Sequence, residues 1–269
     1  MFTGCMSEIP NTSNFEPQVF ITGFLTVGEE YVTVKIQRTV NVDNQSLHPI
    51  NDAQILLFTK DPNGNEELIT SSFDVIEGVY KSAEMVTSIV GNTYWVEIML
   101  SDGTTFVSEE EILKPAIVIN DVKLTNEFNR VFFSDPVDDT NFYLINYHFY
   151  SFFGEPEPDF KINELTNDVL FNGNNNAIFD STGFIYTNPS EIRVYISNLN
   201  FNTYQFYFNQ FAQFENQITN GGPEEPSGPI QLFLPPPANL TGNIINVTNN
   251  TKALGFFGVQ TTTEFIKIF

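Results

Sequence analysis

The clearest structural signal in the sequence is the segment Tyr31-Val32-Thr33-Val34-Lys35-Ile36-Gln37, in which apolar and polar side chains roughly alternate. A period of two puts successive side chains on opposite faces of a β-strand, so this segment predicts a strand with one buried face. Residues 18–24 show the same pattern, and residues 93–100 show it around the single tryptophan, Trp95. We expect Trp95 to be a buried core residue rather than a platform for a ligand.

Similar short strands recur through the first part of the chain, separated by turn sequences such as Asp61-Pro62-Asn63-Gly64-Asn65 and Asp102-Gly103. The further strands are expected at residues 53–59, 67–73, 78–80 and 104–110. Their regular spacing predicts that residues 18–115 form a β-sandwich of immunoglobulin or transthyretin type. A chain of 269 residues is long for one domain, so residues 116–269 are expected to form a second domain.

The second domain is also expected to be β-rich. Long aromatic strands are predicted at residues 142–153 and 191–199, and a terminal strand at residues 263–269. Gly255 and Gly258 flank Phe256-Phe257, a pattern that indicates a bulge or a close approach of two backbones. The fold class is therefore mainly β, with a β-sandwich followed by a second β-rich domain.

One amphipathic helix interrupts this pattern near residues 203–218. Its predicted apolar face carries five aromatic side chains: Tyr204, Tyr207, Phe208, Phe211 and Phe214. Asn202 is the expected N-cap, with Gln205 three residues later as in a capping box. A single helix in a β domain usually covers that domain's own sheet, so we expect the aromatic face to be buried against it.

The charge balance excludes one class of partner. The chain has 11 basic and 33 acidic residues, a formal net charge of −22, which would repel the phosphates of nucleic acids. No run reaches the roughly 18 apolar residues that a membrane-spanning helix needs. The charge is expected to serve solubility at a crowded surface.

The single cysteine, Cys5, cannot form an internal disulfide. The start Met1-Phe2-Thr3-Gly4-Cys5 resembles the end of a bacterial lipobox, in which small residues precede the cysteine that is lipidated. Residues 6–17 are polar and contain two prolines, as suits a tether. We therefore expect residues 1–17 to form a lipid anchor and tether, the alternative being an ordinary exposed cysteine.

The sequence contains no catalytic motif that we recognise: no nucleophile elbow, no phosphate-binding loop, no dinucleotide fingerprint and no zinc-protease motif. The two histidines, His48 and His148, are expected to be surface or core residues rather than bases. We expect no enzymatic activity and no cofactor. Asp135, Asp138 and Asp139 are weak candidates for a cation site, whereas Asp61 is expected to belong to a turn.

The C-terminal part carries a resemblance to a known family. The segments Pro235-Pro236-Pro237-Ala238-Asn239-Leu240 and Ala253-Leu254-Gly255-Phe256-Phe257-Gly258-Val259 resemble the closing signature of a Bacteroidota outer-membrane lipoprotein family of unknown function. Residues 19–23, 31–36 and 51–55 are similar to the opening strands of the same family. Members have a lipobox cysteine, onto which Cys5 maps, and are often encoded beside TonB-dependent receptors. Asp180-Ser181-Thr182 also resembles a bacterial O-glycosylation acceptor, with Ser181 as the modified residue.

Three functions are compatible with these patterns. The resemblance implies a surface-exposed, lipid-anchored accessory protein of a TonB-dependent transporter or another outer-membrane complex, which helps to capture or take up a ligand. The alternative is a free-standing adhesin or a glycan- or protein-binding module, in which exposed aromatic side chains contact the ligand. A hydrolase with two facing carboxylates is a third possibility, which no linear motif supports.

Overall fold

The computed structural model describes residues 16–27, 31–40, 48–137, 140–182, 188–221 and 240–269, with the backbone alone for residues 213–221. Several expectations concern residues outside this description: Cys5 and most of its tether, Asp138, Asp139, and residues 235–239 of the proline-rich segment. In the described part of the chain, no helix combines the length and the apolarity needed to cross a membrane.

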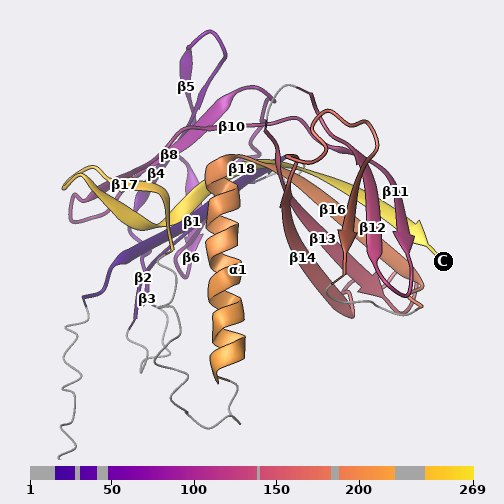
Figure 1. The fold of residues 1–269 in the computed structure, drawn as a ribbon. Coiled ribbons are helices and arrows are strands. Elements are labelled where there is room, and N and C mark those ends of the chain that lie inside the picture. Colours follow the sequence, from indigo (N-terminus) through magenta and orange to yellow (C-terminus); the bar gives the residue numbers. More distant parts are fainter. Residues whose placement is uncertain (1–15, 28–30, 41–47, 138–139, 183–187, 222–239) are drawn as a thin grey trace, which may run out of the picture.

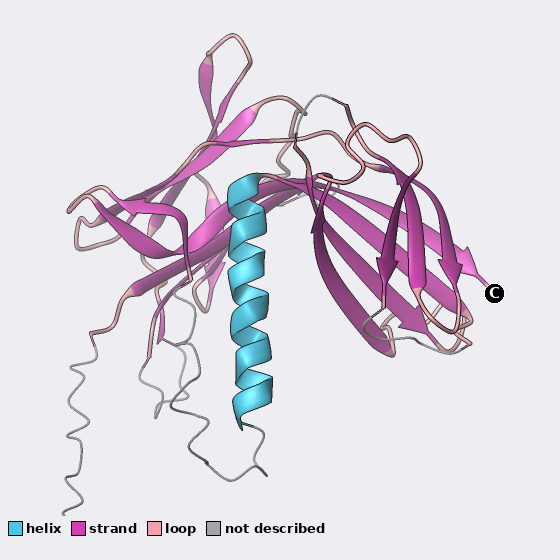
Figure 2. Ribbon diagram, in the orientation of Figure 1, coloured by secondary structure: helices cyan, strands magenta, loops and turns pink. Residues whose placement is uncertain are grey.

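The protein is mainly β with one helix, as the sequence predicts (Figure 2). The strands of the first part are β1 (Val19–Val27), β2 (Thr33–Arg38), β3 (His48–Pro49), β4 (Gln54–Lys60), β5 (Glu66–Thr70), β6 (Phe73–Ile76), β7 (Val79–Ser82), β8 (Thr93–Met99), β9 (Thr105–Ser108) and β10 (Glu111–Ile112). There follow β11 (Val118–Leu124), β12 (Asn129–Ser134), β13 (Phe142–Tyr150), β14 (Phe160–Asn167), β15 (Ala177–Ser181), β16 (Glu191–Leu199), α1 (Phe201–Gly221), β17 (Thr241–Asn246) and β18 (Thr251–Ile268).

The strands enclose two hydrophobic cores. The main path of the large sheet runs β5-β4-β8-β9-β17-β18-β1-β2-β7-β6 and wraps around the first core, which includes Ile21, Val34, Leu57 and Val96. We call these strands, with β3 and β10, the first unit. The second unit comprises β13, β14 and β16 of the same sheet and the separate sheet β11-β12-β15, around a core that includes Val131, Tyr147 and Val194.

The last strand, β18, belongs to both units. Its first half pairs in parallel with β1, from Phe20 opposite Leu254 to Val27 opposite Thr261. Its second half pairs antiparallel with β16, from Asn198 opposite Thr261 to Glu191 opposite Ile268. Figure 1 shows β18 running from one unit into the other. The chain passes from the first unit to the second near the predicted boundary at residue 115. It later comes back to the first unit, because β17 and the first part of β18 contribute Ile244, Phe257 and Val259 to the first core.

The two glycines of β18 make close packing possible, which confirms the expectation drawn from the sequence. Gly255 has a φ of +105°, and a Cβ atom there would lie 1.7 Å from the carbonyl oxygen of Ile21. A Cβ atom on Gly258 would lie 2.4 Å from the ring of Phe256. A bulge is present too, since Thr241 pairs with both Leu254 and Gly255.

A side-chain amide replaces the missing backbone pairs beside this bulge. Asn243 Nδ2 donates to Phe257 O at 2.8 Å, and Phe257 N donates to Asn243 Oδ1 at 3.0 Å. Both residues are buried, with exposed fractions of 2% for Asn243 and 0% for Phe257. The amide thus satisfies two backbone groups that no solvent reaches.

The helix α1 lies against the sheet where the two units meet (Figure 1). Phe206 stacks on Phe256 at a centroid distance of 5.1 Å, and Tyr207 stacks on Phe24 at 5.7 Å. Tyr204 contacts Phe142 of β13 at 4.9 Å. The helix therefore covers the protein's own sheet, as expected.

Two details of the helix differ from the sequence expectation. The apolar face is rotated, because Phe206 is 3% exposed whereas Phe208 is 53% exposed. The expected N-cap is wrong: the helix begins at Phe201, and the first turn has Tyr204 N donating to Asn200 O at 3.0 Å. The Asn202 amide is instead used as a donor to Glu109 and Glu111.

We predict that Asn243→Ala lowers the free energy of unfolding by about 2–4 kcal/mol, because it leaves the N–H and C=O of Phe257 buried without partners. Urea denaturation followed by circular dichroism measures this change. The exposed Asn176→Ala serves as the matched control, with an expected change within about 0.5 kcal/mol. Equal stability of the two variants would contradict the role assigned to Asn243.

Candidate functional site

A groove of about 460 Å³ opens on the face of the large sheet beside α1. We call it the junction groove, because strands of both units and the helix contribute to it. Its lining residues are Thr26, Val27, Leu144, Asn146, His148, Tyr195, Ser197, Tyr207, Gln260, Thr262 and Glu264. Its volume lies in the range of about 300–1,000 Å³ that is usual for small-ligand sites.

Strand alternation explains why these residues meet. Asn146 and His148 of β13 are two positions apart, as are Tyr195 and Ser197 of β16, so each pair lies on one face of the sheet. The register aligns them in rows across the strands. One row is Asn146 opposite Tyr195 and Tyr195 opposite Glu264, and the next includes Ser197 opposite Thr262.

Hydrogen bonds order the polar side chains along these rows. Tyr195 Oη donates to Glu264 Oε1 at 2.7 Å, and the hydroxyls of Ser197 and Thr262 are 2.8 Å apart. Gln260 Nε2 donates to Thr26 Oγ1 at 3.4 Å. Hydroxyl, amide and carboxylate groups on the groove floor are thus held in place by hydrogen bonds before any ligand binds.

Two ring-bearing residues of the groove, Tyr195 and His148, remain uncharged at neutral pH. Burial and the hydrogen bond to Glu264 raise the pKa of Tyr195 to about 12. Burial, together with the charges of Lys161 and Arg193, lowers the pKa of His148 below its usual value. Tyr195 therefore keeps its proton and His148 stays a neutral imidazole, which suits hydrogen bonding to an uncharged ligand.

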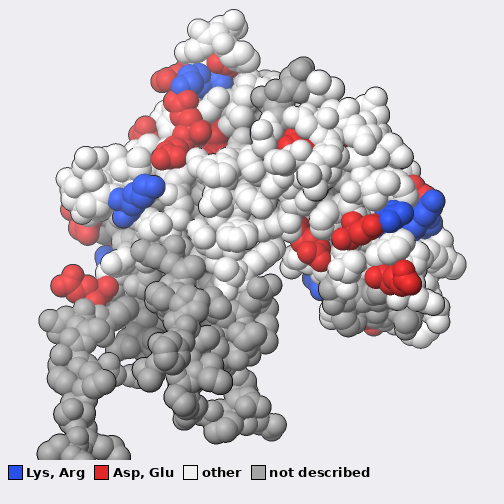
Figure 3. Space-filling model, viewed as in Figure 1, with Lys and Arg blue, Asp and Glu red and all other residues white. Residues whose placement is uncertain are grey.

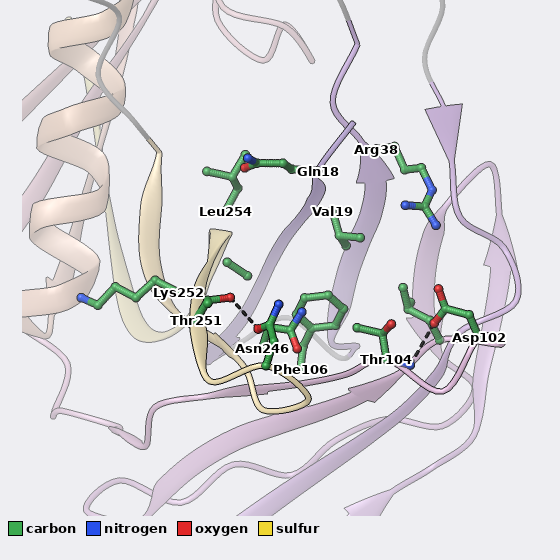
Figure 4. A pocket seen from close by; sticks show the side chains of 13 residues that line it. Gln18, Val19, Arg38, Asp102, Thr104, Phe106, Asn246, Thr251, Lys252 and Leu254 are labelled. Carbon is green, nitrogen blue, oxygen red and sulfur yellow. Dashed lines mark hydrogen bonds between the residues drawn. The ribbon is translucent and has the colours of Figure 1, made fainter. Parts of the chain in front are cut away.

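A second cavity, of about 420 Å³, lies at the end of the first unit where β1 begins. Its polar lining includes Arg38, Asp102 and Lys252, and Figure 4 shows Arg38 and Asp102 on one side with Lys252 on the other. Asp102 Oδ1 accepts a hydrogen bond from Thr104 N at 2.8 Å, which holds the pKa of the carboxyl below its usual value. Arg38 and Lys252 are exposed, and the lining of this cavity is less apolar than that of the junction groove.

A buried carboxyl lies where β10, β17 and α1 meet. Glu111 is 2% exposed, and its Oε1 accepts hydrogen bonds from Asn202 Nδ2 at 3.1 Å and from Asn243 Nδ2 at 3.2 Å. Burial raises the pKa of Glu111 to about 7, against the opposing effect of these amides. No local sequence pattern indicates this group, because Asn202 and Asn243 lie 91 and 132 residues away from Glu111 along the chain.

Of the acidic residues proposed for a cation site, only Asp135 belongs to the described chain. Asp135 is 2% exposed and accepts hydrogen bonds from Tyr143 Oη and from Gly173 N, the latter at 2.6 Å. Burial raises the pKa of Asp135. Asp138 and Asp139 lie outside the described residues, and no group of three or more potential metal ligands occurs among the residues described.

The remaining predicted residues have structural partners or lie outside the description. Ser181 is 2% exposed, and its hydroxyl donates to Glu164 Oε1 at 2.7 Å, so a sugar on Ser181 would require this residue to move outward. Asp61 forms the expected turn, accepting from Asn63 N at 2.9 Å and Asn65 N at 2.8 Å. Cys5 is among the residues not described.

Comparison with known proteins identifies a family model that covers nearly the whole chain. A family model described as "Domain of unknown function (DUF4249)" matches residues 7–266. No curated protein matches the chain in sequence.

Two solved structures are similar at a low level. A tetra-tandem repeat from the extending region of a large adhesion protein has 10% identity and a TM-score of 0.21, with 69% of this chain and 46% of that one covered. Trypsin-activated α-2-macroglobulin from Escherichia coli has 12% identity and a TM-score of 0.22, with 69% and 15% covered. This chain thus spans less than half of either, and such scores support no functional argument.

We predict that Glu111→Gln stabilises the protein increasingly as the pH rises. The pKa of Glu111 is about 7 in the folded protein against 4.5 for an unperturbed carboxyl, so its favourable contribution is complete below pH 4.5 and is lost as the pH rises through 7. The stability difference between variant and parent should grow by about 3 kcal/mol between pH 4.5 and pH 8.

Urea denaturation at both pH values measures this difference. The same change at the exposed Glu67 is the control, and its effect should not depend on pH in this way. A difference for Glu111→Gln that stays constant from pH 4.5 to pH 8 would show that the buried carboxyl is not held in its neutral form.

Proposed function

This chain belongs to the DUF4249 family, and we propose that it is a non-enzymatic, lipid-anchored accessory protein of a bacterial outer-membrane complex. Its tether would be attached through Cys5, and its partner would be a TonB-dependent receptor or a related transporter. The protein would capture a ligand at the cell surface and assist its uptake.

The observation that carries the proposal is the junction groove. It is built on paired strands of both units and is lined by polar groups that hydrogen-bond one another in fixed rows. Tyr195, whose pKa is raised to about 12, acts as a hydrogen-bond donor rather than as a nucleophile at neutral pH. These features favour binding of a ligand over chemical conversion of it.

A second surface supports docking to a larger partner. Phe152 and Phe153, in the loop after β13, are 68% and 67% exposed, and the C-terminal residues Ile268 and Phe269 are each 58% exposed. We call these four residues the aromatic tip. Exposed apolar groups gathered in one place commonly mark an interaction surface.

Backbone hydrogen bonds bring the two parts of the aromatic tip to the same end of the second unit. Ser190 N donates to Tyr150 O at 2.9 Å, and Phe269 N donates to Ser190 O at 3.0 Å. The tip lies at the opposite end of the molecule from the start of β1 (Figure 1). A tether at the N-terminus would therefore leave the aromatic tip free to reach a neighbouring protein.

The charge pattern fits an exposed cell-surface location. Figure 3 shows acidic side chains on both units, with few basic ones on the same face. The formal net charge of −22 favours solubility in a crowded environment.

A free-standing adhesin or glycan- or protein-binding module is the second candidate. The specific feature in its favour is the presence of Tyr195 and Tyr207 in the lining of the junction groove, because aromatic rings are common in ligand sites. Such a module would bind its ligand with no receptor attached.

We predict that the tagged, full-length protein extracted from its native outer membrane in mild detergent carries a lipid on Cys5 and co-purifies with a receptor in a fixed ratio. Mass spectrometry of the N-terminal peptide and of the co-purified proteins measures both. The double change Phe152→Ser and Phe153→Ser should reduce receptor recovery about tenfold or more by removing exposed apolar contacts.

Val169→Ser with Leu170→Ser provides a matched control, because these side chains are 73% and 94% exposed outside the aromatic tip. This control should retain the receptor. An unmodified Cys5 with no co-purifying membrane protein would refute the accessory role and leave the free-standing module.

A further inference from the structure

We infer that the junction groove binds a neutral carbohydrate chain. The inference rests on the proposed role in ligand capture and adds to it the chemical class of the ligand. It is carried by the lining of the groove, whose hydrogen-bonding groups, aromatic rings and charge are each described below.

Much of the backbone of the groove floor is already engaged. β16 lies between β13 and β18, and β18 pairs with β1 as far as Thr261 and with β16 from Thr261 to Ile268. An extended peptide binds a sheet mainly by pairing with the backbone of a free edge. A ligand lying on the face of this sheet must be recognised by side chains instead, which disfavours β-strand addition by a peptide.

The side chains of the groove match the hydroxyl groups of a sugar. Asn146 and Gln260 offer an amide donor and acceptor each, and Glu264 offers two carboxylate oxygens. Neighbouring hydroxyls on a sugar ring can donate to and accept from such planar groups in pairs. The hydroxyls of Ser197 and Thr262 extend the same pattern along the next row.

Gln260 supplies a group that a ligand would satisfy. The residue is 9% exposed, and its Oε1 is a buried atom with no hydrogen-bond partner within the described structure. A buried acceptor without a donor is energetically costly. Rotation of the Gln260 side chain toward the groove would let a ligand hydroxyl donate to Oε1 and remove this cost on binding.

Aromatic side chains border the polar rows. The ring of Tyr195 lies 4.9 Å from that of His148, and Tyr207 reaches the groove from the helix. Tyr207 is held in place by stacking on Phe24 at 5.7 Å with an angle of 13° between the rings. Both tyrosines can pack against the C–H faces of sugar rings, and a rigid ring costs little side-chain entropy on binding.

Charge favours a neutral ligand over an acidic one. Glu264 is the only carboxylate and no Lys or Arg occurs among the described residues that line the groove. With a formal net charge of −22, the protein would repel a polyanion. An uncharged chain of hexoses or pentoses therefore fits better than a uronic acid polymer.

The purified full-length chain tests this inference without any membrane partner. An array of neutral glycans would be probed first, followed by calorimetry with maltohexaose, cellohexaose, xylohexaose and mannohexaose. Oligogalacturonate and an uncharged hexapeptide are the comparison ligands. We expect saturable binding of at least one neutral oligosaccharide and none of the comparison ligands.

Two variants locate the binding to the groove. Glu264→Gln removes the charged acceptor and Gln260→Met removes the amide at similar volume, so each should weaken the affinity for the oligosaccharide about tenfold or more. Glu67→Gln and Gln54→Met make the same changes at exposed positions on β5 and β4 and should leave the affinity unchanged. Matching thermal unfolding curves show that all four variants fold.

Each outcome decides the inference. Absence of binding to every neutral glycan, binding of the acidic oligomer or the peptide alone, or unchanged affinity in both groove variants would overturn it. Co-purification of a receptor with the groove variants would at the same time leave the accessory role standing. Failure of the carbohydrate site and failure of the accessory role are therefore distinguishable.

Discussion

The continuous strand β18 is the constraint on which the rest of the structure depends. Its backbone supplies hydrogen bonds to β1 in the first unit and to β16 in the second, so the two cores share one rigid element. Phe257 and Val259 belong to the first core, and Phe265 packs against the second. The two units are therefore linked by a continuous strand, and α1 adds contacts to both, through Phe24 of β1 and Phe142 of β13.

The helix and the junction groove depend on this arrangement. Phe24 and Phe256 lie on neighbouring strands and present their rings to α1, so the helix covers one part of the sheet face. Beyond Tyr207 the same face continues with Gln260, Thr262 and Glu264, which line the open groove. Alternate residues of β18 therefore face the same side of the sheet: Phe256 packs against the helix, and the later ones line the groove.

Local patterns in the sequence predicted much of the fold. Alternation identified β2 and β8, the aromatic periodicity identified α1, and the glycines at 255 and 258 indicated the bulge. The continuity of β18 was missed because Gln260, Thr261 and Thr262 form a polar run that resembles a break between two strands. Such residues can occupy a strand interior when the face they occupy borders a polar groove.

The candidate site was less predictable, because its residues come from distant positions. Asn146, Tyr195 and Glu264 form one row across three strands, although the first and last are more than 100 residues apart in the chain. Glu111 and Asn243 meet in the same way. The local sequence around these residues does not indicate the order of strands in the sheet that brings them together. Contacts between residues so far apart in the chain depend on the topology of the whole fold.

The parallel pairing of β1 with β18 also has a mechanical consequence. A pull between the start of β1 and the end of β18 acts on the two strands in opposite directions along their length. The hydrogen bonds from residue 20 to residue 27 would then be loaded together in shear, instead of being opened one after another. A protein held at one end and engaged at the other would resist extension through this one ladder, and its lifetime under load would be set by the rate of unfolding.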